Sequence, residues 1–99
     1  MAKKRITKVT YLKWYEDMLF WRKFEDMSAA LYIQQKIRGF LHLYNGQEAI
    51  LAGSAFAMEK GDKMITAYRN HVQPMALGED PRRIMAELMG KVTGTSRGK

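Results

Sequence analysis

The longest stretch of the chain without glycine or proline runs from Thr10 to about Ile37. Its apolar side chains recur at helical spacing and predict one long helix, with Thr10 as the N-cap. The apolar positions lie on two opposite sides of that helix, one around Trp14 and Trp21 and the other around Phe24. A helix that is apolar nearly all round is buried nearly all round, and so short a chain offers little cover. The pattern therefore predicts a partner surface, from more chain, from another subunit or from both.

Arg22 falls inside the first of these apolar faces, where a charged side chain needs a partner. Glu25 and Asp26 follow about one turn later, at the spacing that lets side chains of one helix meet. We therefore expect Arg22 to be a buried, paired arginine with a structural role.

Glycines divide the remainder of the chain into shorter elements. Asn45 and Glu48 have the spacing of a capping box and predict a second helix over about 46–59. Gly61 suits the left-handed residue that ends such a helix. Small residues at positions 46, 49, 53 and 57 form a stripe along this helix, and such a stripe lets another backbone approach closely.

The last third of the chain combines a strand pattern with two short helical patterns. Apolar and β-branched residues predict a short strand over 63–68. A short helix over about 70–77 follows. Asp80 as cap and Pro81 in the first turn then start a last helix over about 81–89. The predicted fold class is mainly α with one short β-strand.

The composition adds a basic character, with a net charge of +7. Much of the excess lies near the two ends, in residues 1–9 and 91–99. We expect these to be a flexible basic arm and a flexible glycine-rich loop around a helical segment over 10–90. A small basic helical module that binds nucleic acid or another protein is the alternative function from a different class.

Two further features bear on the location of the protein. No apolar run approaches the length of a membrane span, and the basic N-terminus is not followed by the apolar core of a secretory signal. The chain has no cysteine, which excludes disulfides and thiolate sites and fits a cytoplasmic protein.

The polar residues that suggest chemistry are Tyr68, Arg69 and His71, at the end of the predicted strand. An arginine at a strand end, beside a helix start, suits an anion such as a phosphate or a carboxylate. An ordinary surface arginine or an ion pair is the alternative. His42 lies in a short apolar segment, where a histidine is more often structural. No metal-binding pattern accompanies the two histidines, so we expect no metal site.

Four segments, in the same order along the chain, resemble the motifs of one enzyme family. Residues 38–49 (RGFLHLYNGQEA) match R-G-F-x-H-L-x-x-G-Q-E-A, and residues 65–71 (ITAYRNH) match I-T-x-Y-R-x-H. Residues 85–91 (MAELMGK) match M-A-E-L-x-G-[KR], and residues 15–25 match Y-x-x-M…R-x-F-E. The chain thus resembles the α subunit of thiamin-diphosphate-dependent 2-oxo acid dehydrogenases, closest to that of pyruvate dehydrogenase, from about residue 11 onward.

The resemblance implies roles for particular residues. Tyr68 and Arg69 match the pair that contacts the diphosphate region of thiamin diphosphate. His42 matches a catalytic histidine near the substrate, and His71, in the same strand-end loop as Arg69, is a second-tier candidate. Many members have glycine just after the position of His71, where this chain has Val72, and this departure bears on the conformation of the loop.

The resemblance also implies a fold and an activity. The fold is the N-terminal portion of an α/β thiamin-diphosphate-binding fold. The activity of the complete enzyme is oxidative decarboxylation of pyruvate, with acetyl transfer to a lipoyl group. The implied partners are a β subunit in an α2β2 assembly and the lipoyl domain of the acyltransferase, with no nucleic acid and no membrane.

The magnesium site of the family, a G-D-G…N-N stretch, has no counterpart in residues 1–99. We therefore expect these residues to be an N-terminal fragment of the α subunit that is inactive alone. The segment over 46–49 favours pyruvate or acetoin over branched-chain substrates. The α subunits of acetoin and branched-chain 2-oxo acid dehydrogenases are the alternatives within the family.

Overall fold

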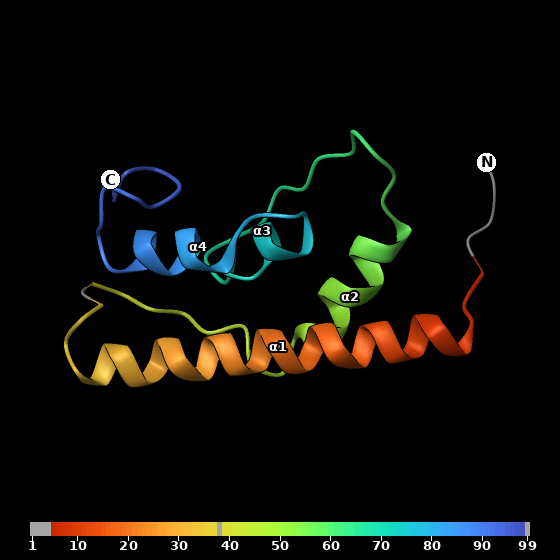
Figure 1. Ribbon diagram of the computed structural model, residues 1–99, viewed down its shortest axis with the longest axis horizontal. Helices are drawn as coiled ribbons and strands as arrows, with labels where there is room; N and C mark the ends of the chain where they lie inside the picture. The colour runs from red at the N-terminus through yellow and green to blue at the C-terminus, as the bar shows by residue number, and fades with distance from the viewer. Residues whose placement is uncertain (1–4, 38, 99) are drawn as a thin grey trace.

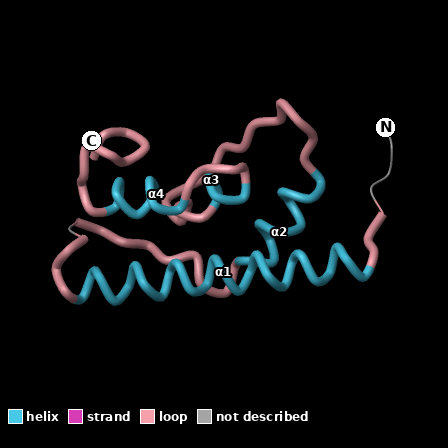
Figure 2. Tube along the Cα trace, viewed as in Figure 1, coloured by secondary structure: helices cyan, strands magenta, loops and turns pink. Residues whose placement is uncertain are grey.

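A computed structural model describes residues 5–37 and 39–98, which form four helices and no strand (Figures 1 and 2). The helices are α1 (Lys8–Ile33), α2 (Glu48–Ala57), α3 (Gln73–Ala76) and α4 (Pro81–Leu88). Figure 1 shows α1 along the length of the molecule, with the three shorter helices on one side of it. Part of the expected basic arm, residues 1–4, lies outside the described residues, as do Arg38 and Lys99.

The start of α1 lies earlier than predicted, and Thr7 rather than Thr10 is its N-cap. The Thr7 hydroxyl accepts the backbone N–H of Thr10 at 3.3 Å, and the Thr10 hydroxyl accepts the backbone N–H of Thr7 at 3.2 Å. This reciprocal pair satisfies N–H groups that the first turn of a helix leaves without partners. Thr10 therefore belongs to the first turn of the helix, which explains the earlier start.

The end of α1 is also earlier than predicted, at Ile33. Gln35 takes the left-handed conformation, with a φ of 63°. The backbone N–H of Gln35 donates to the carbonyl of Tyr32 at 2.9 Å, and the next N–H along the chain donates to the carbonyl of Leu31 at 3.0 Å. This is a Schellman termination, which usually contains a glycine. A left-handed glutamine therefore ends the helix before the first glycine is reached.

The capping box predicted at the start of α2 is wrong. Asn45 does not cap the helix, because its side-chain amide donates to Asp26 on α1 at 3.0 Å. The N-cap residue is Gln47, and its side chain makes no cap hydrogen bond. The carboxylate of Glu48, however, accepts the backbone N–H of Gly46 at 2.9 Å. Glu48 is the first residue of α2 and Gly46 is not its N-cap, so the predicted capping box is absent and the asparagine instead joins the loop to α1.

The predicted helix end at Gly61 and the predicted helix start at Asp80 have different outcomes. Met58, in an extended conformation, already ends α2, so Gly61 lies in a later turn with a φ of 94°. Asp80 caps α4 as predicted, since its Oδ1 accepts the backbone N–H of Arg82 at 2.9 Å. Pro81 is the first residue of that helix. The cap and proline signals are local, and they hold without help from the rest of the fold.

The predicted strand over 63–68 is wrong. This segment has no regular secondary structure, and no backbone hydrogen bond joins it to another described segment. Ile65 is 99% exposed, so its side chain packs against nothing. A strand needs a neighbouring strand to take up its N–H and C=O groups, and none lies beside it. The expected fold class, mainly α with a strand as part of an α/β fold, is therefore wrong for the described residues, which are all helix and loop.

One apolar core lies between the middle of α1 and the segments beside it. Its buried members are Trp21, Phe24, Tyr44, Leu51, Ala52, Val72 and Ile84. They come from α1, α2 and α4, and from the connections that precede α2 and α3. Burying a large apolar side chain is worth roughly 1.5–3 kcal/mol, so these contacts hold the connecting segments against α1.

Arg22 forms its ion pair with another helix and not along its own. Its guanidinium donates to both carboxylate oxygens of Glu48 on α2, at 2.5 and 3.0 Å. The predicted partners Glu25 and Asp26 do not meet it, and its side chain is 46% exposed, so the expectation of a buried arginine is also wrong. The hydrogen bond from Arg22 holds the pKa of Glu48 below its ordinary value, against the opposing effect of burial. The pair fastens the start of α2 to α1.

The N-terminal half of α1 keeps much of its apolar surface exposed, as the pattern predicted. The exposed side chains are Tyr11, Leu12, Tyr15, Leu19 and Phe20. The small-residue stripe predicted over 46–57 is also open, since no described atom beyond the adjoining backbone lies within 4 Å of the Cβ position at Gly46 or Gly53. The described residues therefore leave an apolar surface uncovered along α1 and an open stripe on α2.

Candidate functional site

The candidate site lies where two connecting segments, residues 40–44 and 68–71, meet beside the middle of α1. The rings of His42 and Tyr68 are in edge-to-face contact, with centroids 4.7 Å apart and 66° between their planes. The ring of Phe40 stacks on His42 at 6.5 Å. Two residues that the sequence analysis singled out separately are therefore neighbours in the fold.

Arg69 joins the two segments directly. Its Nη1 donates to the backbone carbonyl of Leu43 at 2.7 Å, and its guanidinium carbon lies 5.5 Å from the centre of the Tyr68 ring. A guanidinium has five N–H donors. The bond to Leu43 is the one side-chain hydrogen bond that Arg69 makes within the described residues. Arg69 therefore combines a fixed position with spare donors, which suits an anionic ligand.

His71 is held from α1, on the inner side of the same segment. Its Nδ1 lies 3.4 Å from Oε2 of Glu25, and its side chain is 13% exposed. The same carboxylate oxygen accepts the backbone N–H of Tyr44 at 2.8 Å. Glu25 thus contacts both segments that carry the candidate site.

An open cavity of about 330 Å³ lies at the junction of these segments. It is lined by Tyr44, Gln47, Thr66, Ala67, Tyr68, Arg69 and Gln73. The Nε2 of Gln73 donates to the carbonyl of Arg69 at 3.1 Å, while its buried Oε1 has no hydrogen-bond partner among the described residues. Burial raises the pKa of the Tyr44 phenol, and the charge of Glu48 raises it further. The lining thus combines the arginine charge with neutral polar groups, and His42 adjoins it through Tyr68.

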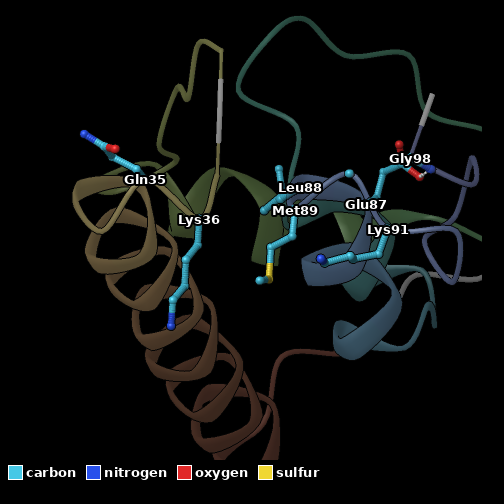
Figure 3. Close-up of a pocket in the computed structure, with 8 residues that line it drawn as sticks. Gln35, Lys36, Glu87, Leu88, Met89, Lys91 and Gly98 are labelled. Atoms are coloured by element: carbon cyan, nitrogen blue, oxygen red, sulfur yellow. Dashed lines mark hydrogen bonds between the residues drawn. The ribbon is translucent and has the colours of Figure 1, made fainter.

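A larger cavity, of about 840 Å³, lies between the C-terminal end of α1 and α4 (Figure 3). Figure 3 shows Lys36 on one side of this cavity and Met89 on the other. Glu87 lines it too, and its Oε1 accepts the backbone N–H groups of Ser96 and Gly98 at 2.6 and 2.9 Å. Glu87 is therefore occupied in holding the C-terminal turn, and none of the predicted site residues lines this cavity.

Within residues 5–37 and 39–98, no group of three His, Cys, Asp or Glu side chains is placed to hold a metal ion. Over the same ranges, no helix is both long enough and apolar enough to cross a bilayer. The polar side chains at the candidate site are those of an arginine, two tyrosines, two histidines, a threonine, a glutamate and two glutamines.

Two residues of this region, Glu25 and Gln73, were not predicted. Glu25 was assigned to Arg22 on helical spacing, yet it is 1% exposed and lies on the buried face of α1 with Phe24 and Ser28. A carboxylate within an apolar stripe was the available signal, because such groups are seldom buried without a purpose. Gln73 offered no comparable signal, since a polar residue at the start of a short helix is ordinary.

Known proteins similar to this chain are named as α subunits of one enzyme. A protein of Arabidopsis thaliana, pyruvate dehydrogenase E1 component subunit alpha-3, chloroplastic, is 48% identical over 94 residues, which cover 95% of this chain and 22% of that protein. The pyruvate dehydrogenase E1 component subunit alpha of Rickettsia conorii is 43% identical over 99 residues, covering 100% and 30%. That of Porphyra purpurea is 47% identical over 94 residues, covering 95% and 27%. The chain thus spans less than a third of the length of each of these relatives.

The family comparison covers the whole candidate site. Residues 16–99 match the family described as dehydrogenase E1 component. This range includes α1 from Glu16 onward and both segments that meet at the cavity. The resemblance inferred from the four motifs is confirmed, and the chain belongs to the dehydrogenase E1 component family.

Proposed function

We propose that the chain forms one wall of a thiamin diphosphate site in an α subunit of the pyruvate dehydrogenase type. In this proposal Tyr68 and Arg69 contact the diphosphate region, and His42 lies next to the reacting substrate. His71 is a second-tier member of the same site. The observation that carries the proposal is the 4.7 Å contact between the rings of His42 and Tyr68, which unites two motif segments into one group of side chains.

The side chains at the cavity fit the chemistry of a diphosphate group. Arg69 supplies a positive charge and further N–H donors beyond its bond to Leu43. Tyr44, Tyr68 and Gln73 add neutral polar groups to the same wall. Thiamin diphosphate supplies the decarboxylation chemistry itself, while the protein binds it and orients it.

Magnesium accompanies the diphosphate in the proposed enzyme, but the described residues do not fit a magnesium site. A magnesium ion takes oxygen ligands, often carboxylates. Arg69 is the charged group among the residues that line the cavity, and within the described part of the chain no cluster of carboxylates adjoins it. We therefore assign the metal ligands to the remainder of the α subunit.

The activity proposed for the whole protein is oxidative decarboxylation of pyruvate, with transfer of the acetyl unit to a lipoyl group. Its proposed partners are a β subunit, in an α2β2 assembly, and the lipoyl domain of an acyltransferase. The exposed apolar half of α1 supports a large partner surface, because patches of this kind usually mark interaction sites.

Residues 1–99 alone are proposed to be inactive. The chain contains no cysteine, and we propose a cytoplasmic location.

A chimaeric subunit tests the role of Arg69. Residues 1–99 replace the matching segment of the Rickettsia conorii α subunit, and the chimaera is reconstituted with its β subunit. Arg69→Met is expected to weaken binding of thiamin diphosphate about 10- to 100-fold, because hydrogen bonds to a charged group are worth about 1.5–3 kcal/mol. Binding is measured by calorimetric titration.

Thiamin without its diphosphate is the matched ligand, and its affinity is expected to stay unchanged in the same variant. Arg83→Met is the control substitution, since Arg83 pairs with Glu79 at 3.1 Å and is 53% exposed. An equal loss for both ligands, or no loss for either, contradicts the proposed contact. Measurable turnover by residues 1–99 with the β subunit alone contradicts the proposed inactivity of the fragment.

A further inference from the structure

Glu25 is a buried carboxylate with few partners. Its side chain is 1% exposed, and it lies among the core residues on the inner face of α1. Its Oε1 is buried and has no hydrogen-bond partner among the described residues. A buried charge without full pairing costs stability, so packing alone does not account for a glutamate at this position.

The other oxygen of Glu25 joins the two segments of the candidate site. Oε2 accepts the backbone N–H of Tyr44 at 2.8 Å, and the Nδ1 of His71 lies 3.4 Å away from it. Tyr44 is the last residue of the segment that carries His42, and His71 lies in the segment that carries Arg69. A single atom on α1 therefore contacts the backbone of one segment and a side chain of the other.

The chemistry of this contact selects one form of the imidazole. For Oε2 of Glu25 to accept a hydrogen bond from the ring, the proton must lie on Nδ1 of His71. In a neutral imidazole the second ring nitrogen then carries a lone pair and accepts. A hydrogen bond from Nδ1 to Glu25 therefore leaves Nε2 as the nitrogen able to accept a proton or a hydrogen bond.

We propose that Glu25 is a positioning residue: it holds His71 as the Nδ1–H tautomer and so directs the free lone pair of the ring to Nε2. The importance of this role for turnover rests on the proposed function, but the tautomer itself does not. If Glu25 only accepted the backbone N–H of Tyr44, it would not determine the tautomer of His71.

Nitrogen NMR of the 99-residue chain labelled in its histidines tests the proposal. The chain has two histidines, so His42 is an internal control in every spectrum. Spectra are recorded at about pH 9, well above the ordinary imidazole pKa of about 6.5, so that neutral rings are observed. We expect His71 to be predominantly Nδ1–H in the wild-type chain.

Two substitutions separate positioning from packing. Glu25→Gln is expected to keep the Nδ1–H form, because the amide oxygen still accepts. Glu25→Met, of similar size but without an acceptor, is expected to shift His71 to predominantly Nε2–H, while the signals of His42 stay unchanged. Glu48→Met is the matched control. It removes another buried carboxylate, one that pairs with Arg22, and it is expected to leave the His71 tautomer unchanged.

An Nε2–H form or an even mixture at His71 in the wild-type chain overturns the proposal, and so does an Nδ1–H form that survives Glu25→Met. If the Glu25→Met variant does not fold, the wild-type and Glu25→Gln spectra still show whether His71 is the Nδ1–H tautomer. The same spectra are silent on cofactor binding. Failure of the proposed function therefore shows in the thiamin diphosphate titration, with the tautomer intact.

Discussion

The two halves of α1 differ in how their side chains are satisfied. The C-terminal half carries the buried Trp21, Phe24 and Glu25, and it is joined by hydrogen bonds to the loop at Tyr44 and to His71. The N-terminal half exposes most of its large apolar side chains. Trp14, by contrast, packs against α2, where its ring lies 5.3 Å from that of Phe56.

The two halves thus separate groups that bond within this chain from an apolar surface that this chain does not cover. Hydrogen bonds within the described residues position Arg69 against Leu43 and Glu25 against Tyr44, so these parts of the candidate site are held by the chain itself. The apolar surface of the N-terminal half remains without cover, and burial of such a surface is the usual driving force for association. Under the proposed function, the candidate site is one wall of the cofactor site, and the uncovered surface of α1 is where the partner subunit packs.

The largest expected effect contrasts two neighbouring residues of α2. Leu51 is 1% exposed, and Leu51→Ala is expected to lower the free energy of unfolding by about 2–5 kcal/mol, because it leaves a cavity in the core. Ile50 is 65% exposed, and Ile50→Ala is expected to change it by less than about 0.5 kcal/mol. Urea unfolding of both variants measures the contrast. Similar losses at the two positions would mean that α2 packs on a different face.

The Arg22–Glu48 pair is expected to have the next largest effect, and one that depends on pH. Glu48→Gln is expected to lower the free energy of unfolding at pH 7 by about 1–2 kcal/mol, because the charge-assisted bonds are lost while solvent screens the half-exposed arginine. The folded state holds the pKa of Glu48 below the ordinary value of 4.5. The contribution of the pair is therefore complete above that value and is lost as the pH falls through the lowered pKa.

Urea unfolding of wild type and Glu48→Gln between about pH 3 and pH 7 measures this pH dependence. Asp17→Asn is the control, because Asp17 pairs with Lys13 at the surface, where ion pairs contribute about 0–1 kcal/mol. A gap between wild type and Glu48→Gln that stays constant over this pH range contradicts the assignment to the charge of Glu48.

The end of α1 offers a smaller effect of opposite sign. Gln35 is left-handed, with a φ of 63°, and glycine adopts this conformation without the steric cost of a Cβ atom. Gln35→Gly is expected to raise the free energy of unfolding by about 0.5–1 kcal/mol. Gln34→Gly is the control, since Gln34 has a φ of −77°, where glycine gives no relief. Thermal unfolding of both variants measures the difference, and a gain in both or in neither argues against strain at Gln35.

The smallest effect on stability is expected on the exposed face of α1. Tyr15 is 69% exposed, and Tyr15→Ser is expected to change the free energy of unfolding of the chain by less than about 0.5 kcal/mol. In the chimaeric subunit, by contrast, we expect the same substitution to weaken association with the β subunit, measured by analytical ultracentrifugation. A loss of stability without a loss of association would reverse the comparison between the two halves of α1.

Prediction from the sequence succeeded for some local signals and failed for others, since the caps at Thr10 and Asn45 and the helix end at Gly61 were wrong. The long helix, its uncovered apolar surface and the Asp80 cap of α4 follow from residue spacing and from hydrogen bonds within one turn. The family motifs, likewise, lie in short segments. His42, Tyr68 and Arg69 were named from the sequence, and their roles remain proposals.

Only the tertiary structure decided which distant groups meet. Arg22 pairs with Glu48 and not with the carboxylates on its own helix, and Glu25 is thereby left for Tyr44 and His71. The strand over 63–68 was wrong for the same reason, since a strand exists only when another strand lies beside it. Helical periodicity is a short-range property of the sequence, whereas the residue that caps a helix also depends on which other groups compete for its side chain. The partner of a charge or of an extended segment depends on where the chain returns in space, and that is determined by the packing of the whole core.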